Sequence, residues 1–182
     1  MSRKYKFHNP EGLYFVSFAV VFWIDVFIRR CYKDILVESL SYCQKNKGLR
    51  IHAWCIMSSH VHMIISSEEE LLPGTLRDMK SYTSAQLKTA IEENPQESRK
   101  EWMILMMKRA GKNNSNNNGF QLWQQNNNPI ELFTKKVIQQ KLEYIHNNPV
   151  IEGFVEKSEE YLYSSAKDYA GMNGILILHK IE

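Results

Sequence analysis

Apolar residues recur along the chain at two spacings, and each spacing predicts one kind of element. Residues 13–21 are mostly aromatic or β-branched and follow a turn-like Asn-Pro-Glu-Gly, so they predict a buried, central first strand. Residues 50–56 and 61–66 are two short strand-like runs separated by Met-Ser-Ser. Their length and closeness predict an antiparallel hairpin whose second strand opens with His60 and His62.

Helical spacing marks four further segments. Residues 30–46 carry apolar side chains at helical intervals and end at Lys-Gly, which is a natural stop. Residues 76–91 predict a helix that begins after Pro-Gly-Thr and ends at Asn-Pro, and residues 99–107 predict another. Residues 131–148 predict a long last helix. Pro149 should end it, because proline lacks the backbone donor and restricts the residue before it.

The remaining segments are polar or short. The Asn-rich residues 113–119 contain no apolar side chain and predict a flexible loop, and residues 126–129 predict a shorter break. Residues 120–123 between them are strand-like, and the apolar tail 175–181 is a candidate last strand. No internal repeat is present, so residues 1–182 predict a single α+β domain with an antiparallel sheet.

Composition agrees with this picture but does not identify a partner. A length of 182 residues suits one domain, and 43% hydrophobic with 24% charged residues is typical of globular proteins. The net charge of +3 is too small to show that nucleic acid is bound. Basic clusters at 29–33, 45–50 and 135–141 suit phosphate contacts, although solvated surfaces carry the same pattern.

Cysteine usage and hydropathy bear on location. The three cysteines, Cys31, Cys43 and Cys55, are odd in number and never closely paired, which argues against a disulfide framework and a zinc site. The aromatic-rich stretch 13–28 is interrupted by polar residues and does not predict a membrane span. We therefore expect a reducing, cytoplasmic location and no contact with a membrane.

His60 and His62 form the first candidate site. Side chains alternate along a strand, so both imidazoles project from one face while Val61 is buried on the other. Neutral imidazoles bind several divalent metals, but two ligands leave a site incomplete, and a third oxygen or nitrogen must come from elsewhere in the fold. Because the motif is short, the alternative is a pair of partly exposed histidines without a ligand.

A second candidate site lies near the end of the last predicted helix. Tyr144 and Asn148 are four residues apart, so they are neighbours on a helix, and Lys141 falls on the same flank. This flank offers a phenol as nucleophile, an amide oxygen as third metal ligand and an ammonium as phosphate contact. The alternative is a structural tyrosine with a buried ring, because the chain has nine tyrosines.

Two stretches resemble the single-tyrosine HUH transposases of insertion sequences, and in particular the REP-associated tyrosine transposases: residues 52–65 (HAWCIMSSHVHMII) and residues 141–155 (KLEYIHNNPVIEGFV). His60-Val61-His62 matches the pattern of histidine, hydrophobic residue, histidine. Residues 144–150 match the helix signature of the REP-associated branch, which is tyrosine, isoleucine, two residues, then Asn-Pro-Val. Weaker similarity covers most of the chain.

The resemblance implies a ferredoxin-like or RRM-like antiparallel sheet with helices packed on it. It implies Tyr144 as the nucleophile and Mg²⁺ or Mn²⁺ held by His60, His62 and Asn148, although insertion-sequence relatives have glutamine at the position of Asn148. The implied reaction is DNA transposition: cleavage of single-stranded DNA with hairpin ends and strand transfer through a covalent 5′-phosphotyrosine intermediate.

The resemblance also bears on DNA contacts and assembly. Besides Lys141, we expect Arg77, Lys80 and Tyr82 on the helix at 76–91 to contact single-stranded DNA, although core packing is an alternative for Tyr82. Insertion-sequence relatives work as homodimers, while the REP-associated branch can act as a monomer. The sequence leaves open which applies here, and whether the tyrosine serves the histidines of its own chain.

Two other functions remain open at this stage. One is a non-catalytic, RRM-like module that binds nucleic acid or regulates its own locus without cutting. The other is a metal-dependent hydrolase that uses the two histidines and a bound water, with Tyr144 merely structural. The co-occurrence of His60, His62 and Tyr144 favours the transposase over both.

Overall fold

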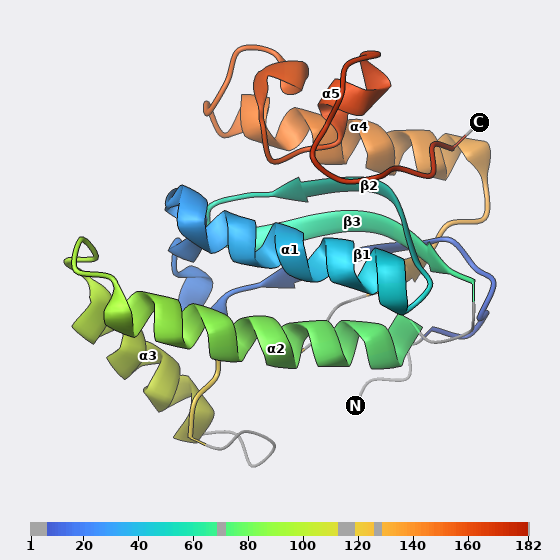
Figure 1. Ribbon diagram of the computed structural model, residues 1–182. Coiled ribbons are helices and arrows are strands. Elements are labelled where there is room, and N and C mark those ends of the chain that lie inside the picture. The colour runs from blue at the N-terminus through green and yellow to red at the C-terminus, as the bar shows by residue number, and fades with distance from the viewer. Residues whose placement is uncertain (1–6, 69–71, 113–118, 126–128, 182) are drawn as a thin grey trace.

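The computed structural model describes residues 7–68, 72–112, 119–125 and 129–181 (Figure 1). Its elements follow in this order: β1 (Tyr14–Ala19), 3-10 turns at Val21–Trp23 and Val26–Ile28, α1 (Arg30–Asn46), β2 (Leu49–Ile56), β3 (His60–Ser67), α2 (Leu72–Glu93), α3 (Lys100–Lys112), β4 (Ile130–Glu131), α4 (Lys135–Ile151), a 3-10 turn at Ser158–Glu160, and α5 (Ala166–Tyr169).

The described strands form one antiparallel sheet in the order β2-β3-β1-β4. β1 lies inside the sheet, and β2 and β3 form a hairpin, so both of these predictions are confirmed. Helices pack on this sheet, which confirms the α+β class (Figure 1). Across the described part of the chain, no helix combines the length and the apolar character needed to cross a membrane.

The register of β1 against β3 decides which side chains share a face of the sheet. Ser17 lies opposite His62 and Phe18 opposite Val61, and directly opposed residues of antiparallel strands point to the same side. α2 covers the Phe18 side, because the Lys80 ammonium lies 5.6 Å from the centroid of the Phe18 ring. α4 lies on the opposite side of the sheet from α1 and α2 (Figure 1). His62 therefore faces α4.

The first three helices form where the sequence pattern predicts them, with shifts at the ends of the second and third. α1 has the predicted bounds, and Gly48 (φ 62°) follows it in the left-handed conformation that glycine adopts without steric cost. α3 begins at Lys100, one residue later than predicted, and continues to Lys112. α2 begins at Leu72 rather than at 76, so Pro73 lies in its first turn. Proline is tolerated there because its missing N–H would have no partner within the helix.

The last helix, α4, begins later than predicted. Ile130 and Glu131 form β4, which pairs with β1, so the predicted start at 131 is wrong. Thr134 marks the true start, because its side chain accepts a hydrogen bond from the backbone N–H of Val137. This contact satisfies a donor that the first turn of a helix leaves without a partner.

Pro149 does not end α4, contrary to the prediction, and the helix continues to Ile151. Proline removes only its own donor, and the N–H of Glu152 still donates to the carbonyl of Asn148. Gly153 (φ 75°) then turns the chain away from the helix. Asn148 is consequently held inside the last turns of α4, where its side chain is buried.

Two predicted strands do not form in the described residues. Trp123 makes only an isolated bridge to Val20, and the residues before it belong to no strand. The tail 175–181 also forms no strand, although the N–H of His179 donates to the carbonyl of Ile51. Of the predicted loop at 113–119 and break at 126–129, residues 113–118 and 126–128 lie outside the described part of the chain.

Another segment pairs with the outer edge of β2 near its end, away from the point at Ile51 that the tail contacts. The N–H of Ile56 donates to the carbonyl of Tyr163, and the N–H of Ser165 donates to the carbonyl of Trp54. Backbone groups at a sheet edge otherwise offer a template for association with other chains. The segment after α4 therefore covers this edge.

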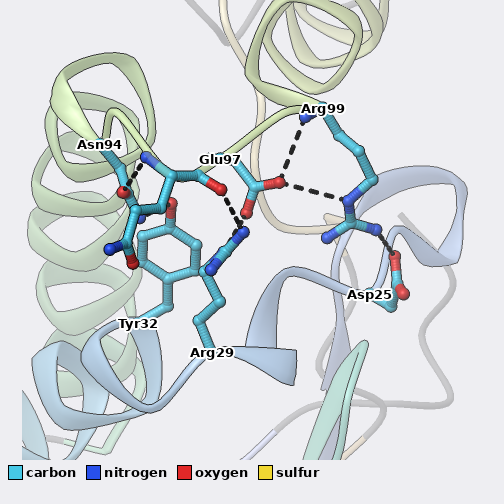
Figure 2. A network of polar contacts seen from close by, with 7 residues as sticks. Asp25, Arg29, Tyr32, Asn94, Glu97 and Arg99 are labelled. Atoms are coloured by element: carbon cyan, nitrogen blue, oxygen red, sulfur yellow. Dashed lines mark hydrogen bonds and ion pairs between the residues drawn. The ribbon is translucent and has the colours of Figure 1, made fainter.

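A polar network anchors the chain after β1 to the connection between α2 and α3 (Figure 2). The Glu97 carboxylate is buried and accepts a hydrogen bond from Arg29 Nε at 2.7 Å and another from Arg99 Nε at 3.3 Å. Arg99 also donates to Asp25 at 2.6 Å. Burial alone would raise the pKa of Glu97, but the bonds from the two guanidinium groups outweigh it and hold that pKa below its ordinary value.

Replacing this carboxylate should destabilise the fold. We expect Glu97→Gln to lower the free energy of unfolding at pH 7 by about 1–3 kcal/mol, because charge-assisted hydrogen bonds to a buried group are lost. A depressed pKa in the folded state means that the carboxylate stabilises above its unfolded pKa, about 4.3, and loses this effect as pH falls. Urea unfolding at pH 7 and pH 3 measures both effects.

The matched control is Glu38→Gln, which changes an exposed carboxyl on α1. It should unfold like the wild type at pH 7. Equal stabilities of wild type and Glu97→Gln at pH 7, or a difference that grows on acidification, would contradict the role given to Glu97.

Candidate active site

The two histidines lie side by side at the start of β3. Their ring centroids are 4.7 Å apart, which confirms that they project from one face of the strand. Backbone hydrogen bonds hold the turn that precedes them: Val20 N–H donates to the carbonyl of Ser59, and Phe27 N–H donates to that of Ser58, both at 2.8 Å. The start of β3 is therefore fixed against the segment that follows β1.

Tyr144 reaches these histidines from α4 of the same chain. Its hydroxyl oxygen lies 3.3 Å from Nε2 of His62, and the two ring centroids are 5.0 Å apart. Phe15 of β1 stacks on His62 at 5.6 Å and meets the Tyr144 ring edge-on at 6.1 Å. Tyr144 remains 44% exposed, so its hydroxyl is accessible while its ring is held in place.

The environment keeps both imidazoles neutral. Burial, followed by the nearby His60 and the charge of Lys141, lowers the pKa of His62 to about 3. Burial also lowers the pKa of His60, although Glu152 opposes the shift. Neutral imidazole is the form that binds a metal, because the cation has no free lone pair.

The donor set fits a divalent metal. Nδ1 of His62 is buried and has no hydrogen-bond partner among the described residues. A buried polar atom without a partner costs free energy, and a bound ligand can offset that cost. Within the described ranges, no group of three or more His, Cys, Asp and Glu could hold an ion. A third protein ligand would therefore be of another type, such as the amide oxygen of Asn148, one turn after Tyr144.

Lys141 supplies positive charge at the same place. Its ammonium lies 4.5 Å from the centroid of the Phe15 ring and 5.6 Å from that of Tyr144. Lys141 and Tyr144 of the predicted flank thus lie next to His62, and Asn148 follows one turn later on the same helix. The site brings together a phenol, two neutral imidazoles and a cation, a combination suited to a phosphodiester.

The other predicted DNA contacts are not near this site. Arg77, Lys80 and Tyr82 belong to α2, which covers the opposite face of the sheet. The Lys80 ammonium donates to the carbonyl of Gln124 at 2.8 Å, and burial lowers its pKa to about 8. Arg77 pairs with its neighbour Asp78, and Tyr82 is 55% exposed. The exposure of Tyr82 argues against the alternative that it packs in the core.

Two exposed aromatic residues, one of them beside His60, were not predicted as site residues. Phe22 and Trp23 follow β1, and their side chains are 53% and 60% exposed. Both have φ of 56°, the only positive values among the described non-glycine residues. Such a conformation costs bulky residues about 1–3 kcal/mol each. The Trp23 ring meets His60 edge-on at 5.4 Å between centroids.

Comparisons with known proteins agree with this fold. Residues 24–104 match the family described as Transposase IS200 like; this range contains both histidines and stops before Tyr144. A solved structure of a REP-associated tyrosine transposase bound to a REP hairpin is similar over 100% of this chain and 94% of its own, with a TM-score of 0.67 and 16% identity. That likeness shows a shared fold.

A second solved structure, a putative transposase from Deinococcus radiodurans, matches 80% of this chain and 97% of its own, with a TM-score of 0.45 and 17% identity. No curated protein matches the chain. The family match over residues 24–104 supports a transposase, an enzyme that acts in DNA transposition, and the solved structures support the fold. Over residues 24–104 the chain is thus similar to the IS200-like transposases.

Proposed function

We propose that the chain cleaves single-stranded DNA with hairpin ends in a metal-dependent reaction and transfers the strand through a covalent 5′-phosphotyrosine on Tyr144. The observation that carries this proposal is the 3.3 Å separation between the Tyr144 hydroxyl and His62 within one chain. One copy of the chain contains the whole site, so the proposed chemistry needs no second subunit. A homodimer is compatible with it.

Tyr144 is the nucleophile of the proposed reaction. Its oxygen attacks the scissile phosphorus in line with the bond to the 3′ oxygen, which breaks as the bond to tyrosine forms. The phenol proton leaves to solvent, to which Tyr144 is exposed, and the departing 3′ oxygen takes up a proton. The energy of the broken bond is kept in the phosphotyrosine. Attack by a 3′ hydroxyl on this linkage joins a strand and restores Tyr144.

His60 and His62 would hold Mg²⁺ or Mn²⁺, with Asn148 as the third ligand. A phenol has a pKa near 10 and attacks poorly at neutral pH, so the phosphorus has to be polarised. A bound divalent ion supplies this polarisation at a non-bridging phosphate oxygen. The neutral state of both imidazoles and the buried, partnerless Nδ1 of His62 support this assignment.

The substrate is proposed from the site and from the solved relative. That relative is bound to a REP hairpin. In this chain, Lys141 would contact the phosphate beside Tyr144. Contacts from Arg77, Lys80 and Tyr82 would lie on the far side of the sheet, so they would bind DNA away from the cleavage point.

The described cysteines are free, which agrees with a reducing cytoplasm.

The test is incubation of the protein with a 3′-labelled single-stranded hairpin DNA and Mn²⁺, followed by a denaturing gel. We expect a labelled strand that migrates with the protein, and its loss when a chelator is added. A metal-dependent hydrolase would instead release a free 5′ phosphate with no protein attached. Tight binding without any cleavage would favour the non-catalytic module. Either result would overturn the proposed chemistry.

A further inference from the structure

The segment after β1 presents two aromatic side chains to solvent in a conformation that such residues rarely adopt. Phe22 and Trp23 both have φ of 56°. A bulky residue with positive φ persists only where the surrounding structure imposes it, and such positions concentrate at functional sites. Both rings are more than half exposed, so packing of their own side chains does not explain the strain.

The segment is fixed at both ends. Before the two aromatics, the N–H of Val21 donates to the carbonyl of Leu122 at 2.8 Å. After them, Ile24 is buried, and Asp25 accepts the 2.6 Å hydrogen bond from Arg99 that Figure 2 shows. The backbone is therefore anchored on both sides of Phe22 and Trp23, and the exposed rings are presented by a rigid support.

The position of Trp23 connects it to the proposed chemistry. Trp23, His60, His62 and Tyr144 form a chain of neighbouring rings, with successive centroids 5.4, 4.7 and 5.0 Å apart. A phosphate that contacts His60 and His62 would have Tyr144 beside His62 and the exposed indole beside His60. A neighbouring nucleotide of the same strand is therefore brought next to Trp23.

We propose that Trp23, with Phe22 beside it, is a stacking platform for an unpaired base adjoining the scissile phosphate. This inference rests on the proposed function, because it takes the scissile phosphate to lie between His60 and Tyr144. A nucleobase fits better than a peptide, since sites for single-stranded DNA combine exposed aromatic rings with a cation that contacts the backbone. Here the cation is Lys141, on the other side of the histidines.

The test measures binding rather than cleavage, in a Tyr144→Phe background that cannot form the adduct. Fluorescence anisotropy gives the Kd for a single-stranded hairpin DNA and for a series in which each nucleotide near the cleavage point is made abasic. We expect Trp23→Ala to weaken binding about 5- to 150-fold, the range for loss of one stacked base, and Trp23→Phe to retain most of the affinity.

The stacked base is identified by combining Trp23→Ala with each abasic DNA and comparing the loss of affinity with that of each change alone. At one adjoining position, the abasic DNA should lose as much affinity as Trp23→Ala does, and the two changes together should lose no more. The matched control is Trp102→Ala, which removes another half-exposed tryptophan from α3 and should bind like the background protein. The abasic series with an intact Trp23 does not depend on the folding of any Trp23 variant, so it tests independently whether a base near the cleavage point is bound.

Two results would overturn the platform: no loss for any abasic position with Trp23 intact, or losses that multiply with Trp23→Ala at every position. Failure of the proposed chemistry gives a different pattern. If the wild type forms no adduct but the coupling between Trp23 and one base is present, Trp23 belongs to a DNA-binding site that does not cleave. An adduct without the coupling would leave the chemistry standing and remove the platform.

Discussion

Tyr144→Phe is expected to abolish the covalent protein–DNA adduct while leaving binding of hairpin DNA nearly unchanged. The substitution removes one oxygen, the proposed nucleophile, and keeps the ring that packs against Phe15 and His62. Without a nucleophile the displacement cannot start, so adduct formation should fall at least about 1,000-fold. A denaturing gel with 3′-labelled DNA measures the adduct, and anisotropy measures binding.

The control for this variant is Tyr42→Phe, which removes the hydroxyl of a 58% exposed tyrosine on α1. It should form the adduct at the wild-type rate. An adduct that persists in Tyr144→Phe would show that another residue is the nucleophile. Loss of both adduct and DNA binding would point to a structural role for the hydroxyl.

The second large effect is expected for His62→Ala. The variant removes a neutral imidazole in contact with Tyr144, so cleavage at a fixed Mn²⁺ concentration should fall at least about 100-fold. Calorimetry measures the affinity of the protein for Mn²⁺ in the presence of an uncleavable hairpin DNA. We expect His62→Ala to weaken this affinity as well as the rate of cleavage. This second measurement separates loss of a metal ligand from loss of a residue that only positions Tyr144.

His179→Ala is the matched control for His62→Ala. His179 is exposed, and its backbone carbonyl and N–H make the hydrogen bonds to His52 and Ile51, while its ring only lies 6.2 Å from that of His52. The variant should therefore keep both cleavage and Mn²⁺ binding. Wild-type Mn²⁺ affinity in His62→Ala would remove His62 from the proposed metal site, whatever the rate of cleavage.

The local pattern of side chains in the sequence was sufficient to predict the strands that carry the two histidines. The alternation of side chains along a strand placed His60 and His62 on one face, and the short Met-Ser-Ser break gave the β2–β3 hairpin. Helical spacing likewise placed Tyr144, Asn148 and Lys141 on one flank. These features depend on neighbours within one element, which a sequence shows directly.

Contacts between elements that are far apart in the sequence could not be predicted from local patterns. Tyr144 and His62 are 82 residues apart in the chain, and only packing of α4 on the sheet brings them together. A resemblance to a family could suggest this pair, but spacing could not. It could not place Lys80 either, because its helix pattern is the same whichever face of the sheet α2 covers.

Errors at helix ends and in the aromatic segment have the same origin. The start of α4 was misplaced because pairing of Ile130 and Glu131 with β1 outweighs their helical pattern. In the sequence, Phe22 and Trp23 continue the apolar run of the first strand, so they look like a continuation of that buried strand. Their positive φ follows directly after the hydrogen bond from Val21 to the carbonyl of Leu122, a contact that no local signal encodes.

The most direct test of the proposed chemistry is to identify the residue that carries the DNA. After reaction with a short single-stranded hairpin DNA and Mn²⁺, the protein is digested with a protease and a nuclease, and the peptides are sequenced by mass spectrometry. We expect one peptide with a nucleotide joined through its 5′ phosphate to Tyr144. A nucleotide on any other residue, or cleaved DNA with no modified peptide, would contradict the assignment of Tyr144 as the nucleophile.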